Sequence, residues 1–196
     1  GAPQCLPVDE SHPVIPVDYN GVHKYATEHY HLLLTRLGKI DAMVLRLTNI
    51  YGPKLAVGLT CQGFLGAFFR RAAQEQPIEV FGDGEQLRDP VYVDDAVDAF
   101  LAAGAIENPS HRVVNIGSGV PVSLLRIATK IAAAAGSPAP RLRPFPSERK
   151  KIDIGSYHAC PQLAASMLGW KPRVEMAQGI ASTLEYLRAH PAQLVE

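Results

Sequence analysis

Three side chains that could move protons lie close together near the start of the chain. Tyr19, His23 and Lys24 supply a phenol, an imidazole and an ammonium group. A phenol, with an unperturbed pKa of about 10, is a poor base until a nearby cation such as Lys24 stabilises the phenolate. The imidazole of His23, with an unperturbed pKa of about 6.5, can accept a proton without such help. The stretch therefore predicts a site for proton transfer.

Lys24 lies on a predicted helix that begins at Asn20 or Gly21. Side chains three and four positions apart share one face of a helix, so Lys24 faces back toward Asn20 and Gly21 rather than squarely toward Tyr19. The sequence alone therefore leaves the identity of the base open.

Short apolar runs alternate with helix signals along most of the chain. We expect helices at about residues 20–37, 63–75, 94–105, 123–135, 161–168 and 176–189, and strands at about 42–47, 78–81 and 113–116. Residues 49–53 are expected to form a turn, and residues 137–159 short extended pieces at most. Alternating strands and helices predict an α/β fold.

The composition is that of an ordinary globular protein. Of the 196 residues, 47% are apolar, and 19 Lys and Arg balance 19 Asp and Glu. We therefore expect no nucleic-acid partner, and no membrane partner, since no apolar run reaches the ~18 residues of a membrane span. Cys5, Cys61 and Cys160 are far apart and odd in number, which favours reduced thiols in a cytoplasm. The histidines show no ligand spacing, so no metal is expected.

Five segments together resemble the extended short-chain dehydrogenase/reductases, in the NAD-dependent sugar-nucleotide epimerase/dehydratase family and its UDP-glucose 4-epimerase-like branch. Residues 17–28 are similar to its Tyr-x-x-x-Lys helix, 46–53 to Arg-x-x-Asn-x-Tyr-Gly-Pro, 82–95 to Gly-x-Gly-x-x-x-Arg-Asp-Phe-x-x-Val-x-Asp, 113–119 to Val-x-Asn-x-Gly-Ser-Gly and 168–172 to Leu-Gly-Trp-x-Pro. Their common order and spacing are more specific than any single segment. The resemblance implies the C-terminal part of a Rossmann-type doubly wound parallel sheet plus a small α/β substrate-binding lobe.

Several positions depart from the family pattern. Asn20 stands where the motif has its Tyr, His23 where it often has Ser, and Tyr19 lies one residue early. Pro90 replaces an aromatic residue. Because an amide does not titrate, Asn20 cannot take the role of the Tyr. Three interpretations stay open: Tyr19 swings in from the helix start, His23 acts as the base, or the site is impaired.

The resemblance implies ligand-binding roles near the first two motifs. Lys24 would hold the nicotinamide ribose of NAD as well as stabilise a phenolate. Asn49 follows a central strand, and ligands of open α/β sheets bind beyond the carboxyl ends of strands, so Asn49 would hydrogen-bond the substrate. Asp94 and Asp95 are interpreted as helix caps rather than as catalytic groups, and residues 113–119 as structural.

The resemblance also implies contacts with a nucleotide diphosphate. Arg88 would grip it, since the planar guanidinium fork binds phosphate oxygens bidentately. Arg149 is expected to make a second contact. Arg143, Lys150 and Lys151 compete with Arg149 for that role.

The implied activity is that of an epimerase or dehydratase acting on a nucleotide sugar. NAD would oxidise a sugar carbon, rotation or elimination would follow, and the hydride would return. The chain contains no Gly-x-Gly-x-x-Gly or Gly-x-x-Gly-x-x-Gly dinucleotide fingerprint. We therefore expect the C-terminal part of a longer protein, without turnover by itself.

Three alternatives remain. The first is a non-catalytic nucleotide-sugar-binding module with Asn20 in place of the Tyr. The second is a 4,6-dehydratase or 4-reductase of the same family. The third is a chain that only assembles, with itself or with a missing half, through an exposed sheet edge.

The resemblance suggests a division of the chain and an assembly. Residues 1–135 would hold the remaining Rossmann-type domain, interleaved with substrate-lobe segments at about 50–90, and residues 136–196 would form the C-terminal substrate-binding lobe. Members of the family are commonly homodimers through the active-site helix and the helix after the next strand. We therefore expect a cytoplasmic homodimer.

Overall fold

The structure, a computed structural model, describes residues 1–57 and 63–194. Its helices are α1 (Tyr19–Arg36), α2 (Phe64–Ala73), α3 (Val93–Gly104), α4 (Leu124–Ala135), α5 (Ser147–Lys150), α6 (Gln162–Leu168), α7 (Met176–Ala189) and the 3-10 helix η1 (Pro191–Leu194). Its strands are β1 (Val44–Leu47), β2 (Asn49–Tyr51), β3 (Glu79–Phe81), β4 (Leu87–Arg88), β5 (Pro90–Tyr92), β6 (Val113–Ile116), β7 (Val122–Ser123) and β8 (Arg141–Arg143).

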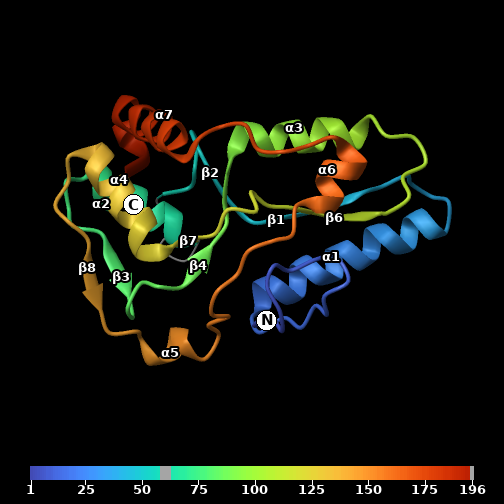
Figure 1. The fold of residues 1–196 in the computed structure, drawn as a ribbon, viewed down its shortest axis with the longest axis horizontal. Helices are drawn as coiled ribbons and strands as arrows, with labels where there is room; N and C mark the ends of the chain where they lie inside the picture. The colour runs from blue at the N-terminus through green and yellow to red at the C-terminus, as the bar shows by residue number, and fades with distance from the viewer. Residues whose placement is uncertain (58–62, 195–196) are drawn as a thin grey trace.

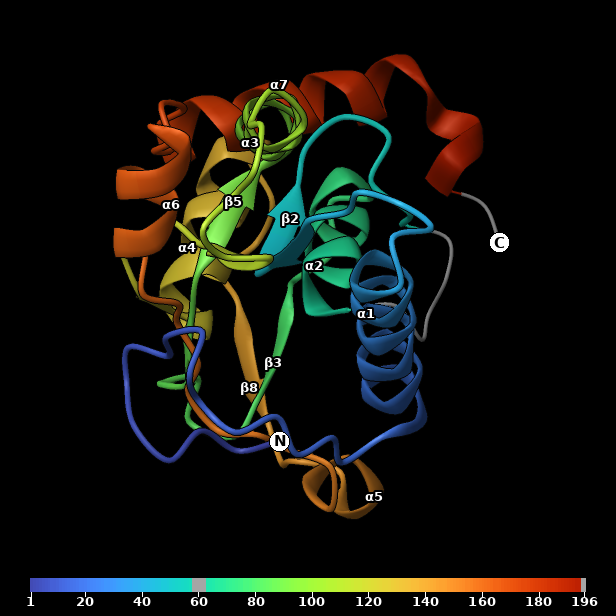
Figure 2. The same ribbon diagram turned by 90° about the vertical axis from the view of Figure 1, so that its right-hand side faces the viewer.

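The strands pair mainly in parallel. β1 pairs with β6, β2 with β5 and β3 with β8 in parallel, whereas β4 and β7 are antiparallel. Figure 1 shows β1 and β6 at one end of the molecule, with α1 below them and α3 above. At the other end, β3 and β8 run side by side near α2, α4 and α7 (Figure 2). This architecture confirms the α/β fold class.

Local signals fix the helix ends. The Asp18 side chain accepts a hydrogen bond of 2.6 Å from the backbone N–H of Gly21 and so caps α1. Gly38, just past α1, has a φ of 66°, and Gly136, which ends α4, has a φ of 73°. Ser123 caps α4 through a first-turn amide. The helices predicted at 20–37 and 123–135 are confirmed, with α1 beginning at Tyr19, slightly before the predicted start.

Two apolar clusters hold the elements together. In the first, α2, α4 and α7 pack on one another through side chains that include Phe69, Ile127, Ile131 and Leu184, together with Ile78 just before β3. The second joins β5 and β6 to α3 and α6. Its buried members are Val91, Ala96, Ala99, Val114, Ile116, Ala164 and Trp170. The partly buried Leu45 and Ile50 pack against this cluster, which thereby also holds β1 and β2 beside the candidate site.

Two of the predicted segments were wrong in detail. Residues 49–51, expected in a turn, form β2, because Asn49 and Tyr51 find parallel partners in Pro90 and Tyr92. Residues 137–159 contain α5, a one-turn helix, in addition to the extended strand β8. The partner that decides β2 is distant in sequence, and local residue types do not report it.

The interpretation of Asp94 and Asp95 as helix caps is wrong, because neither side chain caps α3. The N-cap of α3 is Tyr92, and no side chain caps this helix. The buried Asp95 carboxylate instead accepts hydrogen bonds from the backbone N–H groups of Arg173 and Val174, at 2.9 and 3.1 Å. Asp95 therefore ties α3 to the segment that leads into α7.

The described residues include no helix that is long and apolar enough to cross a membrane. Cys5 and Cys160 are free thiols, and Cys61 lies outside the described residues. Within residues 1–57 and 63–194, no cluster of three or more His, Cys, Asp or Glu residues is arranged to hold a metal ion.

Candidate functional site

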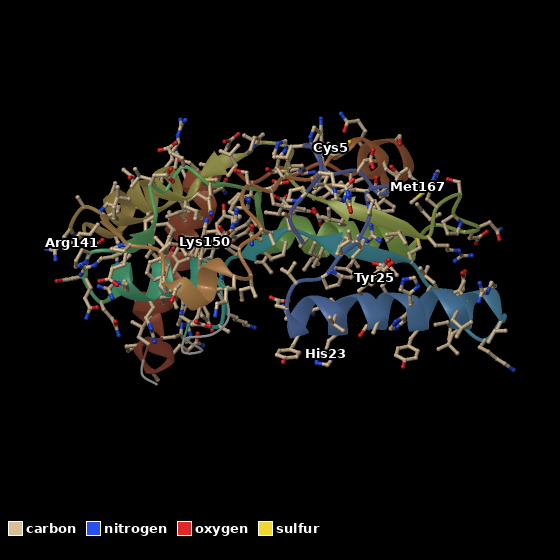
Figure 3. The ribbon with its side chains drawn as sticks, turned by 90° about the horizontal axis from the view of Figure 1, so that it is seen from below. Cys5, His23, Tyr25, Arg141, Lys150 and Met167 are labelled. Atoms are coloured by element: carbon tan, nitrogen blue, oxygen red, sulfur yellow. The ribbon has the colours of Figure 1, made fainter. Side chains whose placement is uncertain are left out.

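The three candidate proton-transfer residues at the start of α1 differ in exposure and in the direction of their side chains. Tyr19 is the first residue of α1 and its side chain is 88% exposed. His23 points away from the rest of the molecule, whereas Tyr25 points toward the sheet (Figure 3). Lys24 lines a groove between α1 and β1, and Tyr19 and His23 are not among the residues of its wall. The structure therefore brings Lys24 into the groove without the two predicted bases.

The groove has a volume of about 870 Å³ and runs along β1. From α1 it is lined by Asn20, Gly21, Lys24, Tyr25, Thr27, Glu28 and His31. Residues 43–48, Asn115 and Tyr157 form much of the opposite wall. The expected sharing of one helix face by Asn20, Gly21 and Lys24 is confirmed. Asn20, which occupies the position of the motif Tyr, presents an amide to the groove.

Thr48 and Asn49 lie where β1 leads into β2. The Thr48 hydroxyl oxygen is buried, lines the groove and has no hydrogen-bond partner in the described part of the chain. A buried hydroxyl without a partner is costly, and a ligand that supplied one would lower that cost. Asn49 pairs with Pro90, two residues after Arg88. The fold therefore places the two predicted substrate contacts on neighbouring segments.

Backbone carbonyls hold the Arg88 guanidinium. Its Nη1 donates to the carbonyl oxygens of Leu87 and Gly155, at 2.8 and 2.6 Å. Burial lowers the pKa of Arg88, and the nearby Asp153 carboxylate partly offsets that effect. The half-buried cation is oriented before any ligand arrives, which suits an anion-binding role.

Arg149 differs from its competitors in having no carboxylate partner among the described residues. Its guanidinium lies over the Phe81 ring, 5.4 Å from the centroid. The competing cations pair with carboxylates: Arg143 with Glu79, Lys150 with Asp153 and Lys151 with Glu148. Among the described residues Arg149 forms no ion pair and is exposed. Its contact with a diphosphate stays a prediction.

Asp89 organises the loops around this region. Its fully buried carboxylate accepts hydrogen bonds from the backbone N–H and hydroxyl of Ser118 and from the N–H of Ala159. Segments 87–92, 117–119 and 157–160 thus meet at one carboxylate. The structural interpretation of residues 113–119 fits this arrangement.

Tyr25, Glu28 and Tyr157 are among the residues of the groove wall that sequence reasoning missed. Glu28 could have been found, since it follows Lys24 by four residues and so shares its helix face. Burial raises the pKa of Tyr157, the Asp89 carboxylate raises it further, and the Arg46 guanidinium lowers it. No local signal marks Tyr157, because its place depends on chain segments far apart in sequence.

Comparison with known proteins now identifies the family. The model of the NAD dependent epimerase/dehydratase family matches residues 1–117. The chain belongs to this family. It is 34% identical over 194 residues to a UDP-glucose 4-epimerase of Mycolicibacterium smegmatis, covering 96% of this chain and 58% of that protein.

Solved structures agree with this assignment. The crystal structure of UDP-glucose 4-epimerase from Thermotoga maritima with UDP-glucose superposes with a TM-score of 0.83 at 30% identity, covering 95% of this chain and 58% of that one. The enzyme from Bifidobacterium longum, in complex with NAD+ and UDP, gives a TM-score of 0.80 at 24% identity, over 98% of this chain and 62% of that one, and shows the fold alone. The Rossmann-like fold of these enzymes is thus confirmed for the chain, which spans about three fifths of their length.

Proposed function

We propose that the chain forms the nucleotide-sugar-binding part, and the cofactor-ribose contact, of an NAD-dependent epimerase or dehydratase, most similar to a UDP-glucose 4-epimerase. The observation that carries this proposal is the placement of Lys24 in the groove beside β1, with Asn49 of β2 paired with Pro90 and Arg88 of β4 two residues before Pro90. The family membership supports it.

The groove wall suits the ribose of NAD. Lys24 offers an ammonium donor, and the unpartnered Thr48 hydroxyl offers a group that can donate or accept a hydrogen bond. NAD, when bound, would accept a hydride from a sugar carbon and later return it. In this proposal Lys24 holds the ribose, Asn49 contacts the sugar nucleotide, and Arg88, assisted by Arg149, holds the diphosphate.

Ligand-dependent thermal unfolding tests the proposal. A ligand that binds only the folded chain at about 100 times its Kd adds ~2.7 kcal/mol, which is about 5–11 °C in Tm for a chain of this size. We expect UDP and UDP-glucose to raise Tm, and Arg88→Ala to remove that increase. Arg126→Ala, on the exposed face of α4, is the matched control and should keep it. Equal behaviour of both variants would refute the assignment of Arg88.

A second candidate function is a non-catalytic nucleotide-sugar-binding module. It is favoured by the amide of Asn20 in the groove and by the 88% exposure of Tyr19. A chimera that joins this chain to the dinucleotide-binding part of the M. smegmatis relative distinguishes the two. Higher epimerisation of UDP-glucose by the Asn20→Tyr chimera would indicate an impaired site. Lower epimerisation would show that the existing residues, with Tyr19 or His23 as base, are the working arrangement.

A further inference from the structure

α1 carries Lys24, yet apolar packing does not set the position of this helix. Most of its large apolar side chains are exposed, between 40% and 88% (Tyr19, Val22, Tyr30, Leu33 and Leu34), whereas Tyr25 and Leu32 are half-buried. Among the described side chains of α1, Glu28 is the one that is buried. The groove separates much of the inner face of α1 from β1. The contact made by Glu28 is therefore central to fixing the position of this helix.

Glu28 reaches across the groove to Arg46 of β1. The guanidinium donates from Nη2 to Oε1 at 2.7 Å and from Nε to Oε2 at 2.9 Å. The hydrogen bond to Glu28 raises the pKa of Arg46, and arginine is a cation in proteins in any case. Two parallel bonds between planar groups fix an angle as well as a distance. The pair thus restrains both the separation and the rotation of α1.

The arginine end of this pair is itself anchored. Arg46 lies opposite Asn115 in the parallel pairing of β1 with β6. The fully buried Asn115 donates its backbone N–H to Glu10 Oε1 at 2.7 Å and its side-chain amide to the carbonyl of Val8 at 3.1 Å. Arg46 Nη1 also donates to the carbonyl of Glu10 at 3.4 Å. The restraint on α1 is therefore made against a fixed part of the fold.

We propose that Glu28 and Arg46 are a positioning pair that holds Lys24 at a set distance from the carboxyl end of β1. Lys24 precedes Glu28 by one helical turn, about 6 Å along α1. Asn49 follows Arg46 by three residues, about 10 Å along the chain. One ion pair thereby sets the relation between the cation assigned to the cofactor ribose and the amide assigned to the nucleotide sugar. The roles of these two groups rest on the proposed function, whereas the restraint on α1 does not.

Distance measurement between two spin labels tests the restraint. With the native cysteines changed to serine, labels are placed at Tyr30→Cys on α1 and Leu101→Cys on α3, where the original side chains are 67% and 68% exposed. The labelled chain is diluted with an excess of unlabelled chain, so that an assembly of two chains carries one label pair. The unchanged pair should give one narrow distance distribution. Glu28→Gln keeps the side-chain size but offers one acceptor oxygen to the fork, and should broaden the distribution about twofold. Arg46→Lys, which loses the fork but keeps the charge, should broaden it as well.

The controls separate positioning from general stability. Glu79→Gln removes the carboxylate of another Glu–Arg pair, with Arg143, and should leave the distribution narrow. The reversed pair, Glu28→Arg with Arg46→Glu, should restore a narrow distribution. A Glu28→Gln variant that melts earlier but keeps the narrow distribution would overturn the proposal, because the pair would then stabilise without positioning. Absence of a UDP-induced thermal shift in the unchanged chain would refute the proposed function and leave this test intact.

Discussion

Two neighbouring aspartates allow a sharp test of how α3 is held. Asp95 is 2% exposed and accepts two backbone hydrogen bonds, whereas Asp94 is exposed. In Asp95→Asn the amide oxygen can keep one of these bonds, and its NH₂ faces the second N–H. One buried N–H is then unsatisfied, at ~1–3 kcal/mol, and the remaining bond loses its charge. Together these effects should lower the free energy of unfolding by about 3 kcal/mol, or Tm by about 6–12 °C.

Urea unfolding followed by tryptophan fluorescence measures this difference. Trp170 is the single tryptophan of the chain, and its indole N–H donates to the backbone carbonyl of Asp95 at 2.7 Å, so the probe sits at the perturbed site. Both aspartates lie in the first turn of α3. Asp94→Asn therefore loses a similar helix-dipole term, about 0.3–1 kcal/mol, and is the matched control. Equal destabilisation by the two substitutions would refute the hydrogen-bond reasoning. A circular dichroism transition that coincides with the fluorescence transition would justify two-state treatment.

Further substitutions probe packing, charge and assembly. Gly117→Ala would press its new Cβ against Asp89 Oδ2 and should lower the free energy of unfolding by about 1–3 kcal/mol, measured in urea. The hydrogen bond from Arg143, with help from the Arg71 charge, lowers the pKa of Glu79. The pair therefore stabilises the folded chain at a pH above the pKa that Glu79 has in the unfolded chain. This contribution is lost as the pH falls through the lowered pKa of Glu79 in the folded chain. The stability difference between the unchanged chain and Glu79→Gln should therefore shrink between about pH 5 and pH 3 in acid titrations of urea unfolding. We also expect light scattering to show a homodimer that Leu33→Glu, on the exposed face of α1, converts to a monomer; an unchanged mass would place any interface elsewhere. The isolated chain with added NAD should not epimerise UDP-glucose.

Much of the fold could be predicted because its signals are local. A capping aspartate precedes α1, glycines of positive φ follow α1 and α4, and apolar runs mark β1 and β6. Each depends on a few adjacent residues. β2 and α5 were missed because the first exists only through pairing with β5, and the second is a single turn within a proline-rich loop.

The motifs of the candidate site could be predicted from the sequence, but the directions of its side chains could not. Spacing placed Lys24 on the face of Asn20 and Gly21, and the structure agrees. Whether Tyr19 or His23 could reach that face depends on the rotation of α1 against the sheet, which the pairing of Glu28 with Arg46 restrains. That partner lies 18 positions away on another element, so helical periodicity cannot supply it. The base itself stays a prediction.

The long-range pairing of this fold has a consequence for how the chain folds during synthesis. Val8 pairs in parallel with Ala159, and the buried Asp89 accepts the N–H of the same Ala159. Likewise, β1 pairs with β6 and β3 pairs with β8, so each earlier strand lacks its partner until the later strand has been synthesised. Contacts between residues so distant in sequence form slowly, and apolar strands without partners are prone to aggregate meanwhile. On the ribosome, the segment around Val8 must therefore stay unpaired until residue 159 has emerged, so the order of translation sets the interval during which a chaperone can protect this protein.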